Sequence, residues 1–425
     1  MAKFHKFDSG LRVLYENNKI NKATNIEISF DCGARCDGDL SGLAHFCEHM
    51  MFTGTDKLSK QEVTKRYFDF IKANAFTSNN TIVFAGEIVT SRLAEYLTVV
   101  QDMICNSTFT PKAVEAERKI ITQEIAQDAD KHSHHANRLI DYELYKLEHL
   151  KNGVLGSEST ISKITSKDVK KYIKKYFVKN NCIISVCTPL AFNKVIGLIK
   201  KHFDEIMPSG NLKPLPYMES KLIEEQNVKL YKKDISKNFF SIVFKSNKSG
   251  PNLKYYVALD IICDMLSDIG YGLTKELRID NSLIYGMGVN YMINKVNSYL
   301  ALFTEICAQN IKPCIDVIAN YINRLKLNGF TEEQFKKQRE KDEYYWQTDV
   351  CNPGRVRWEL LRYRFYGRFV NKEDIHKASK ALTLAEVNEV ARELFNNAKI
   401  QMFVYGDATR QDIYTIKQVQ KKFEK

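Results

Sequence analysis

The stretch Ser41-Gly42-Leu43-Ala44-His45-Phe46-Cys47-Glu48-His49-Met50-Met51-Phe52 decides how the rest of the chain is interpreted. It predicts a helix, because Ser41 can serve as the N-cap and no proline interrupts the run. Residues four apart share a helix face, so His45 and His49 can present ring nitrogens to one point, and Glu48 leans toward it. Two interpretations stay open here: a helix whose partly buried histidines bond to backbone carbonyls, or a zinc site with Glu48 as the base that activates water.

The chain has 425 residues, of which 44% are hydrophobic, so it is long enough for two or three domains with sizeable cores. No apolar run approaches the roughly 18–20 residues that span a membrane. The first eight residues contain no apolar signal segment, so we expect no membrane association and a cytoplasmic location. The ten cysteines are scattered without Cys-x-x-Cys pairs and should be mostly reduced core residues, although Cys32, Cys36 and Cys47 lie near the histidines.

The formal net charge of +12 comes mostly from lysines spread over the whole chain. In the run 170–175 the lysines are spaced like the solvated face of a helix, which we favour over a nucleic-acid surface. No helix-turn-helix, zinc-finger or RNA-binding signature accompanies the charge. We therefore expect no nucleic-acid partner.

Strands are expected before the first stretch, and a second helix, one strand and a long helical region are expected after it. Residues 74–81 are either an ordinary loop or an edge strand that pairs with an extended peptide. The expected strands cover residues 11–15, 26–30, 82–88 and 182–187, and the expected helices cover residues 59–71, 91–103, 111–127, 136–147 and 166–176.

The predicted helix over residues 111–127 carries a second pair of acidic candidates. Pro111 suits its first turn, and Glu117 and Glu124 are seven residues apart, so both side chains share a face. Glu124 interrupts the apolar run between Ile120 and Ile125, which argues against a purely solvated carboxylate. A buried carboxylate needs a partner, and a zinc ion is one.

The second half of the chain repeats the first at an offset of about 220 residues. The segment beginning at Phe109 matches one beginning at Phe330, and the helix and strand after Val169 match those after Val387. Residues 208–220 are rich in proline and lack a period, so we place domains at 1–210 and 221–425 with a linker at 211–220. The metal residues are not repeated, because Tyr345 stands where Glu124 would be.

These motifs together resemble the pitrilysin or insulinase family of zinc metallopeptidases, the inverted zincins, in its short two-domain form similar to mitochondrial processing peptidase-like bacterial peptidases. The resemblance covers nearly the whole chain. It rests on the opening strand at residues 9–13, on residues 33–35 with 42–55, on Glu124 75 residues after His49, on residues 74–77, and on Arg278 and Tyr285 with a seven-residue gap. Ala73 and Cys187-Thr188 depart from the pattern without touching the metal chemistry.

The resemblance implies an α+β fold of two homologous domains, each a mostly antiparallel sheet covered by helices, that form half of a clamshell. It implies one zinc ion per chain on His45, His49 and Glu124, with Glu48 as the base and Glu117 as an accessory carboxylate. The remaining implied site residues are Arg278 and Tyr285, which would bind the substrate carbonyl or oxyanion, and the peptide-pairing residues Asn74, Ala75, Phe76 and Thr77.

The implied function is zinc-dependent hydrolysis of unfolded peptides or short polypeptides inside a closed chamber. The implied partners are peptide substrates and a second copy of the chain. The alternatives are the catalytic subunit of a heteromeric processing peptidase, such as a heterodimer with a related subunit, and an inactive scaffold subunit.

Without the resemblance, four features have ordinary structural interpretations that involve no catalysis or binding. Arg278 and Tyr285 suit a surface ion pair and a core tyrosine, and residues 270–272 suit a turn. Residues 344–346 suit a hydrophobic core, and His132, His134 and His135 suit a solvated loop or helix face.

Overall fold

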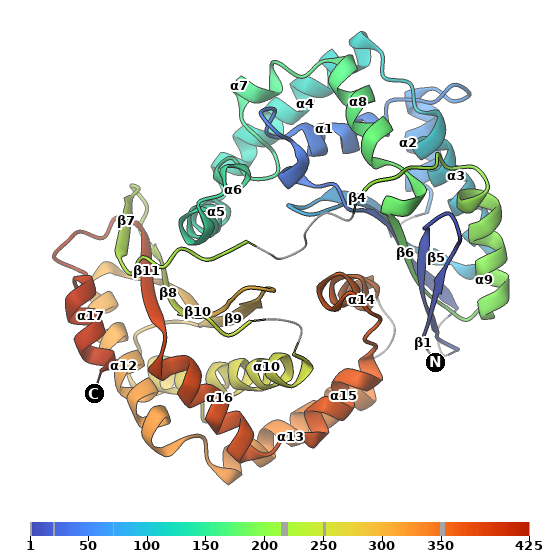
Figure 1. Ribbon diagram of the computed structural model, residues 1–425. Coiled ribbons are helices and arrows are strands. Elements are labelled where there is room, and N and C mark those ends of the chain that lie inside the picture. The colour runs from blue at the N-terminus through green and yellow to red at the C-terminus, as the bar shows by residue number, and fades with distance from the viewer. Residues whose placement is uncertain are drawn as a thin grey trace. The chain divides into compact units, whose positions relative to one another are not determined.

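The computed structural model describes residues 2–19, 22–70, 72–213, 220–249, 252–348 and 353–424, and it divides into two compact units. The first unit contains Met1–Tyr142, Lys146–Tyr217 and Val350–Asn371. The second contains Glu143–Tyr145, Met218–Asp349 and Lys372–Lys425. Each unit has one sheet with helices packed on it (Figure 1), so the predicted α+β class is confirmed.

The first unit is built on a six-stranded sheet with one parallel pair, β2 with β6, and antiparallel pairs elsewhere. The strand β4 lies at an edge of this sheet, so residues 74–77 form the edge strand rather than a loop. In spatial order the strands are β1 (Ala2–Lys6), β2 (Arg12–Asn17), β6 (Cys182–Thr188), β3 (Ala23–Phe30), β5 (Ile82–Val89) and β4 (Lys72–Thr77).

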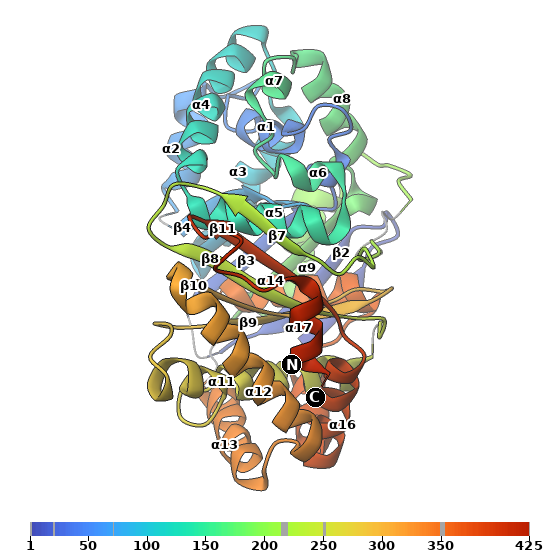
Figure 2. The same cartoon turned by 90° about the vertical axis from the view of Figure 1, so that its left-hand side faces the viewer.

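One face of this sheet is apolar because alternate strand residues, such as Ile26, Ile28 and Phe30, point into the core. Helices cover that face, and α1 packs beside α4 and α8 (Figure 2). The helices of this unit up to the second sheet are α1 (Leu43–Met50), α2 (Lys60–Phe68), α3 (Leu93–Asn106), α4 (Pro111–Ala129), α5 (His132–Tyr145), α6 (Glu148–Lys151), α7 (Glu158–Ile161), α8 (Ser166–Tyr176) and α9 (Phe192–Ile199). The lysines of α8 are exposed while its apolar residues are buried, as the sequence predicts.

The opposite face of the first sheet is polar, and the helix α14 (Pro353–Tyr366) lies on it. This face presents Asn25, Glu27 and Ser29 of β3, all nearly fully buried. Arg364 donates to Ser29 at 2.8 Å and pairs with Asp31. Since α14 lies between β10 and β11 of the second sheet in the sequence, the chain returns to the first unit to cover this face and then goes back to the second unit. The division predicted from the sequence places α14 in the second domain. Residues 214–219 of the predicted linker lie outside the described residues, so the position of the domain boundary stays a prediction.

The second unit repeats the strand order of the first without an equivalent of β1. Its sheet runs β7 (Val228–Lys232), β11 (Lys399–Gly406), β8 (Asn238–Ser246), β10 (Ser298–Ile306) and β9 (Gly288–Ile293), with β7 and β11 parallel. Its helices are α10 (Leu253–Ser267), α11 (Leu273–Lys275), α12 (Ile311–Asn328), α13 (Glu332–Thr348), α15 (Lys372–Ala381), α16 (Leu384–Asn396) and α17 (Ile416–Phe423). This shared order agrees with the internal repeat in the sequence.

Two composition-based expectations are visible in the structure. Eight of the described cysteines are free, and Cys187 is disulfide-bonded. The expectation of mostly reduced cysteines therefore holds among the described residues, with Cys187 as the exception. None of the described helices combines the length and the apolar character needed to cross a membrane.

Candidate metal centre and substrate edge

The helix α1, which carries both histidines, begins differently from the sequence prediction. Its N-cap is Gly42, which has a φ of 93°, and Ser41 is not the cap. The carboxylate of Asp37 accepts hydrogen bonds from the backbone N–H groups of Gly42 at 2.7 Å and Ala44 at 2.8 Å. A Cβ at residue 42 would lie 2.6 Å from the carbonyl oxygen of Leu155, so a glycine is required on two grounds. The predicted Ser41 cap is wrong because the chain turns through a left-handed residue and a distant carboxylate supplies the acceptor.

The side chains of His45, His49 and Glu124 meet at one point. The Oε2 atom of Glu124 lies 3.7 Å from Nε2 of His45 and 3.6 Å from Nε2 of His49. Among the described residues this is the one group of histidine, cysteine or carboxylate side chains with donor atoms close enough to hold a metal ion. Two imidazoles and a carboxylate are a zinc donor set, and tetrahedral ligands at about 2.0–2.1 Å lie roughly 3.3 Å apart. The three residues therefore fit a zinc ion.

The two glutamates of α4 differ in burial: Glu117 is more deeply buried than Glu124. The side chain of Glu124 is 43% exposed, and the neighbouring Ile120 is exposed as well. The buried carboxylate is Glu117, which is only 4% exposed. Glu124 is thus partly buried and faces both histidines, which agrees with the expectation that it is not a purely solvated carboxylate. Of the apolar residues around it, Ile121 and Ile125 pack against the core, whereas Ile120 is exposed.

Glu117 orients His49 by contacting Nδ1, the ring nitrogen opposite the one that faces Glu124. Its Oε2 lies 3.3 Å from Nδ1 of His49, and its Oε1 pairs with the ammonium group of Lys60 at 2.5 Å. Because Nδ1 is engaged by Glu117, Nε2 is the nitrogen that faces His45 and Glu124. A carboxylate on the far nitrogen of a ligating histidine fixes its tautomer and raises its basicity. Lys60 begins α2, so this helix also supports the centre.

The two histidines have opposite pKa shifts. Burial, with the charge of His49, lowers the pKa of His45 to about 4. Burial would also lower the pKa of His49, but hydrogen bonds with Glu117 and Glu124 and the charge of Glu48 raise it to about 9. His45 is thus a neutral imidazole at neutral pH, and His49 carries the proton that a metal ion must displace.

Glu48 lies between the metal centre and the edge strand β4. Its carboxylate is nearly buried, and Thr77 of β4 donates a hydrogen bond to its Oε2 at 2.7 Å. Burial raises the pKa of Glu48, and the Thr77 hydrogen bond counteracts part of this effect. The hydroxyl of Tyr67 donates to the carbonyl of Asn74 at 2.7 Å and fixes the other end of the edge. The candidate base therefore sits beside the end of the free strand edge.

Arg278 and Tyr285 belong to the second unit and contact each other. The guanidinium carbon of Arg278 lies 4.6 Å from the centre of the Tyr285 ring, and Tyr285 is 84% exposed. The interpretation of Tyr285 as a core residue is therefore wrong. A cation over an aromatic ring keeps the two side chains together.

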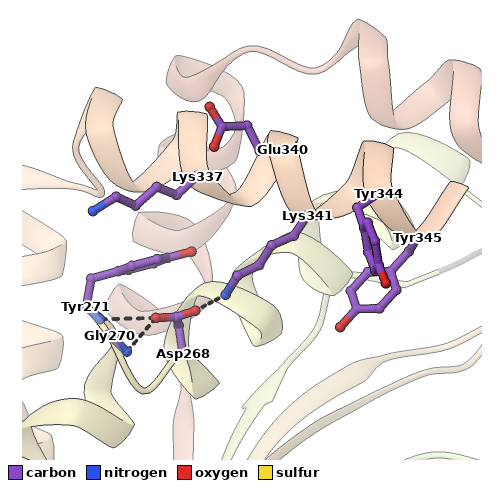
Figure 3. A pocket seen from close by; sticks show the side chains of 8 residues that line it. All are labelled: Asp268, Gly270, Tyr271, Lys337, Glu340, Lys341, Tyr344 and Tyr345. Atoms are coloured by element: carbon purple, nitrogen blue, oxygen red, sulfur yellow. Dashed lines mark hydrogen bonds and ion pairs between the residues drawn. The ribbon is translucent and has the colours of Figure 1, made fainter. Parts of the chain in front are cut away.

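Two other candidate clusters lie apart from the metal ligands. Tyr344 and Tyr345 are 63% and 66% exposed, so their prediction as core residues is wrong, because they line a cavity rather than the hydrophobic core. That cavity of roughly 500 Å³ lies within the second unit between α13 and the turn at Gly270 and Tyr271 (Figure 3). His134 bonds to Asp128 at 3.0 Å, and the cluster of His132, His134 and His135 is no part of the metal-holding group found among the described residues.

Sequence reasoning missed two supporting residues, Asp37 and Lys60, and one contact, the hydrogen bond between Thr77 and Glu48. Asp37 lies outside the usual capping distance, and Lys60 is a helix-starting lysine with no local motif. Thr77 was predicted as part of the peptide-pairing edge, but its bond to Glu48 joins residues 29 apart. The alternation in residues 72–77 is the one signal that could have pointed Thr77 toward the metal helix.

The fold and the inverted His-x-x-Glu-His helix define the class of inverted zincins. Residues 12–158 match the insulinase family (peptidase family M16), and residues 163–341 match the peptidase M16 inactive domain. The chain belongs to the peptidase M16 family, as its motifs indicate. The match to the inactive domain covers a part of the chain that contains none of the three predicted metal ligands.

Known relatives and solved structures extend over almost the whole chain. The sequence is 23% identical over 406 residues to an uncharacterized zinc protease, YmxG, of Bacillus subtilis, covering 93% of this chain and 96% of that protein. It is 22% identical over 418 residues to the mitochondrial-processing peptidase subunit beta of Caenorhabditis elegans, covering 94% and 88%. A protease from Helicobacter pylori shares the fold with a TM-score of 0.81 at 18% identity, covering 96% and 99%.

Proposed function

We propose that this chain is a zinc-dependent endopeptidase that hydrolyses unfolded peptides or short polypeptides, with one zinc ion per chain. The observation that carries the proposal is the contact between Thr77 and Glu48, at 2.7 Å. It joins the candidate base, adjacent in sequence to His49, to a strand whose outer edge pairs with no other strand among the described residues. Backbone groups on a free edge can hold an extended peptide of almost any sequence.

In this proposal His45, His49 and Glu124 hold the zinc ion, which when bound polarises water and the scissile carbonyl. Glu48 takes the proton from water and passes it to the nitrogen of the leaving amine. Glu117 keeps the Nε2 atom of His49 turned toward the centre. Residues 74–77 position the peptide along the edge of β4.

We further propose that Arg278 and Tyr285 bind the substrate carbonyl or the developing oxyanion, and that two copies of the chain complete each other's sites in a closed chamber. Both side chains carry donors, and Tyr285 is exposed enough to contact a substrate. Because these donors and the zinc ligands are all present in one sequence, a homodimer is chemically self-sufficient.

The direct test is a set of three variants assayed for zinc content and for cleavage of a mixed peptide library. His45→Ala and Glu124→Ala should lose both zinc and cleavage. Glu48→Gln should retain zinc and lose cleavage, because it removes only the proton acceptor. Wild-type cleavage rates in Glu48→Gln would show that the base is assigned wrongly.

The dimer proposal has its own test. Glu48→Gln and Tyr285→Phe protein should each be weakly active, since loss of one oxyanion donor costs roughly 10²–10³-fold in rate. After subunit exchange, half the sites of a mixed dimer would carry both substitutions and half would carry neither. Activity should then exceed the sum of the parents. No increase, with exchange verified by native mass spectrometry, would contradict sharing of sites between copies.

One alternative has support from the comparisons. Several relatives are named subunit beta of the mitochondrial-processing peptidase, and a chain of that kind could act as the catalytic subunit beside a related partner. Purified protein that binds zinc, cleaves nothing alone and becomes active with a related subunit would favour this alternative. An inactive scaffold is disfavoured because all four predicted metal-site residues, including Glu48, are present.

A further inference from the structure

The edge strand β4 presents different side chains to the two faces of its sheet. Ala73, Ala75 and Thr77 point to the face that carries α1, since both alanines pack against the hydrophobic core and Thr77 bonds to Glu48. By the two-residue alternation of a strand, Asn74 and Phe76 point to the face covered by α14. An extended peptide paired with β4 would therefore also place every second side chain on the α14 face.

Arg357 of α14 reaches the edge strand on this face. Its guanidinium carbon lies 4.4 Å from the centre of the Phe76 ring. Its Nε donates to the carboxylate of Glu27 at 3.3 Å, which anchors the side chain to β3. A residue from late in the chain thus stands at the proposed peptide edge.

The charge of Arg357 is only partly satisfied within the described residues. Glu27 is 2% exposed, whereas the side chain of Arg357 is 50% exposed. Only its Nε has a hydrogen-bond partner there, so the two terminal NH₂ groups keep four unused donors. Further along the same face of the edge, Lys72 is paired with Glu87 at 2.8 Å. Among the described groups beside Phe76, the exposed guanidinium of Arg357 is therefore paired with no exposed carboxylate.

We propose that Arg357 selects an acidic side chain at the substrate position that pairs opposite Phe76. This inference rests on the proposed peptidase function and on pairing of the peptide with β4. Directly opposed residues of two strands have Cβ atoms about 4.5–5.5 Å apart, so a substrate side chain there lies beside the Phe76 ring and the guanidinium. A carboxylate can accept two parallel hydrogen bonds from the terminal NH₂ groups, which a neutral amide cannot match.

The test uses cleavage-site profiling with wild-type protein, Arg357→Gln and Arg357→Lys. A proteome-derived mixture of unfolded peptides is digested, and the residues flanking each cut are read by mass spectrometry. Wild-type sites should show Asp or Glu enriched at least threefold at one fixed position from the scissile bond. Arg357→Gln should reduce this enrichment to background. Arg357→Lys should keep part of it, because the charge remains but the planar fork is lost.

Arg362→Gln is the matched control, since it makes the same charge change on the same helix at a residue that donates to the carbonyl of Val370 at 3.1 Å. Its profile should match wild type. Two peptides that differ by Glu or Gln at the selected position give a readout that needs no variant. Wild-type kcat/KM should favour the Glu peptide by about five- to tenfold in low salt, and this ratio should fall in 0.5 M NaCl.

The outcomes separate this inference from the proposed function. Wild-type cleavage without acidic enrichment, or enrichment that persists in Arg357→Gln, would overturn the role of Arg357 and leave the peptidase assignment intact. Absence of cleavage by zinc-loaded wild-type protein would remove both. If Arg357→Gln does not fold, the Glu-to-Gln ratio and its salt dependence in the wild type still decide.

Discussion

Glu117→Gln should weaken zinc binding without removing a ligand. In the structure Glu117 is a buried carboxylate that contacts Nδ1 of His49 at 3.3 Å and is held on its other side by Lys60. Glutamine keeps the size and one acceptor oxygen but loses the charge. Changes to groups that orient a metal-ligating histidine cost about 10–100-fold in metal affinity or activity. Since one acceptor remains, we expect a loss near the lower end, about tenfold.

The size of this loss should depend on pH. Displacing a proton from His49, whose pKa is raised to about 9, costs about 2 kcal/mol at pH 7.5. Without the Glu117 charge this pKa falls, so the substitution also removes part of the proton competition. The measured loss should therefore be smaller at pH 7.5 than at pH 9.5, where His49 is mostly neutral in both proteins.

The assay is competition for zinc between metal-free protein and a chromophoric chelator at the two pH values. Glu115→Gln is the control, because Glu115 lies on the same helix and is exposed. It should bind zinc like the wild type. A Glu117→Gln affinity within twofold of wild type at pH 9.5 would refute the orienting role of Glu117.

Two further changes test the local structure. Thr77→Val removes the hydrogen bond that lowers the pKa of Glu48, so the acidic limb of the kcat/KM profile should move to higher pH; a shift to lower pH would contradict the assigned contact. Gly42→Ala should destabilise the protein by about 2 kcal/mol or more in chemical unfolding, because of its φ of 93° and the close Leu155 carbonyl. Gly197→Ala in α9 meets no atom within 4 Å and should be neutral or stabilising; equal effects of the two alanines would argue against the strain at residue 42.

The sequence predicts the local parts of this protein well. The four predicted strands coincide with β2, β3, β5 and β6, and most helices lie within a few residues of their predicted bounds. The convergence of His45 and His49 follows from helix periodicity alone. The convergence with Glu124 follows only from the family resemblance, because it joins residues on two helices.

What the sequence could not supply is contact between distant segments. The bond from Lys60 to Glu117 and the placement of Arg357 over Phe76 have no periodic signal. Exposure was also hard to predict for aromatic residues, since Tyr344 and Tyr345 look like core residues in sequence and line a cavity instead. The roles of Arg278 and Tyr285 stay predictions that the mixed-dimer experiment tests.

The return of α14 to the first sheet constrains how the protein can be made. A ribosome releases the six strands of that sheet by residue 188, but the helix that covers its polar face ends at Tyr366. Translation adds roughly 5–20 residues per second, so Arg357 is synthesised on the order of ten seconds or more after Glu27, with which it pairs. The first unit therefore completes its fold only after most of the second has been synthesised. A gene fragment ending at the middle of the chain would leave that face open to water and to other chains.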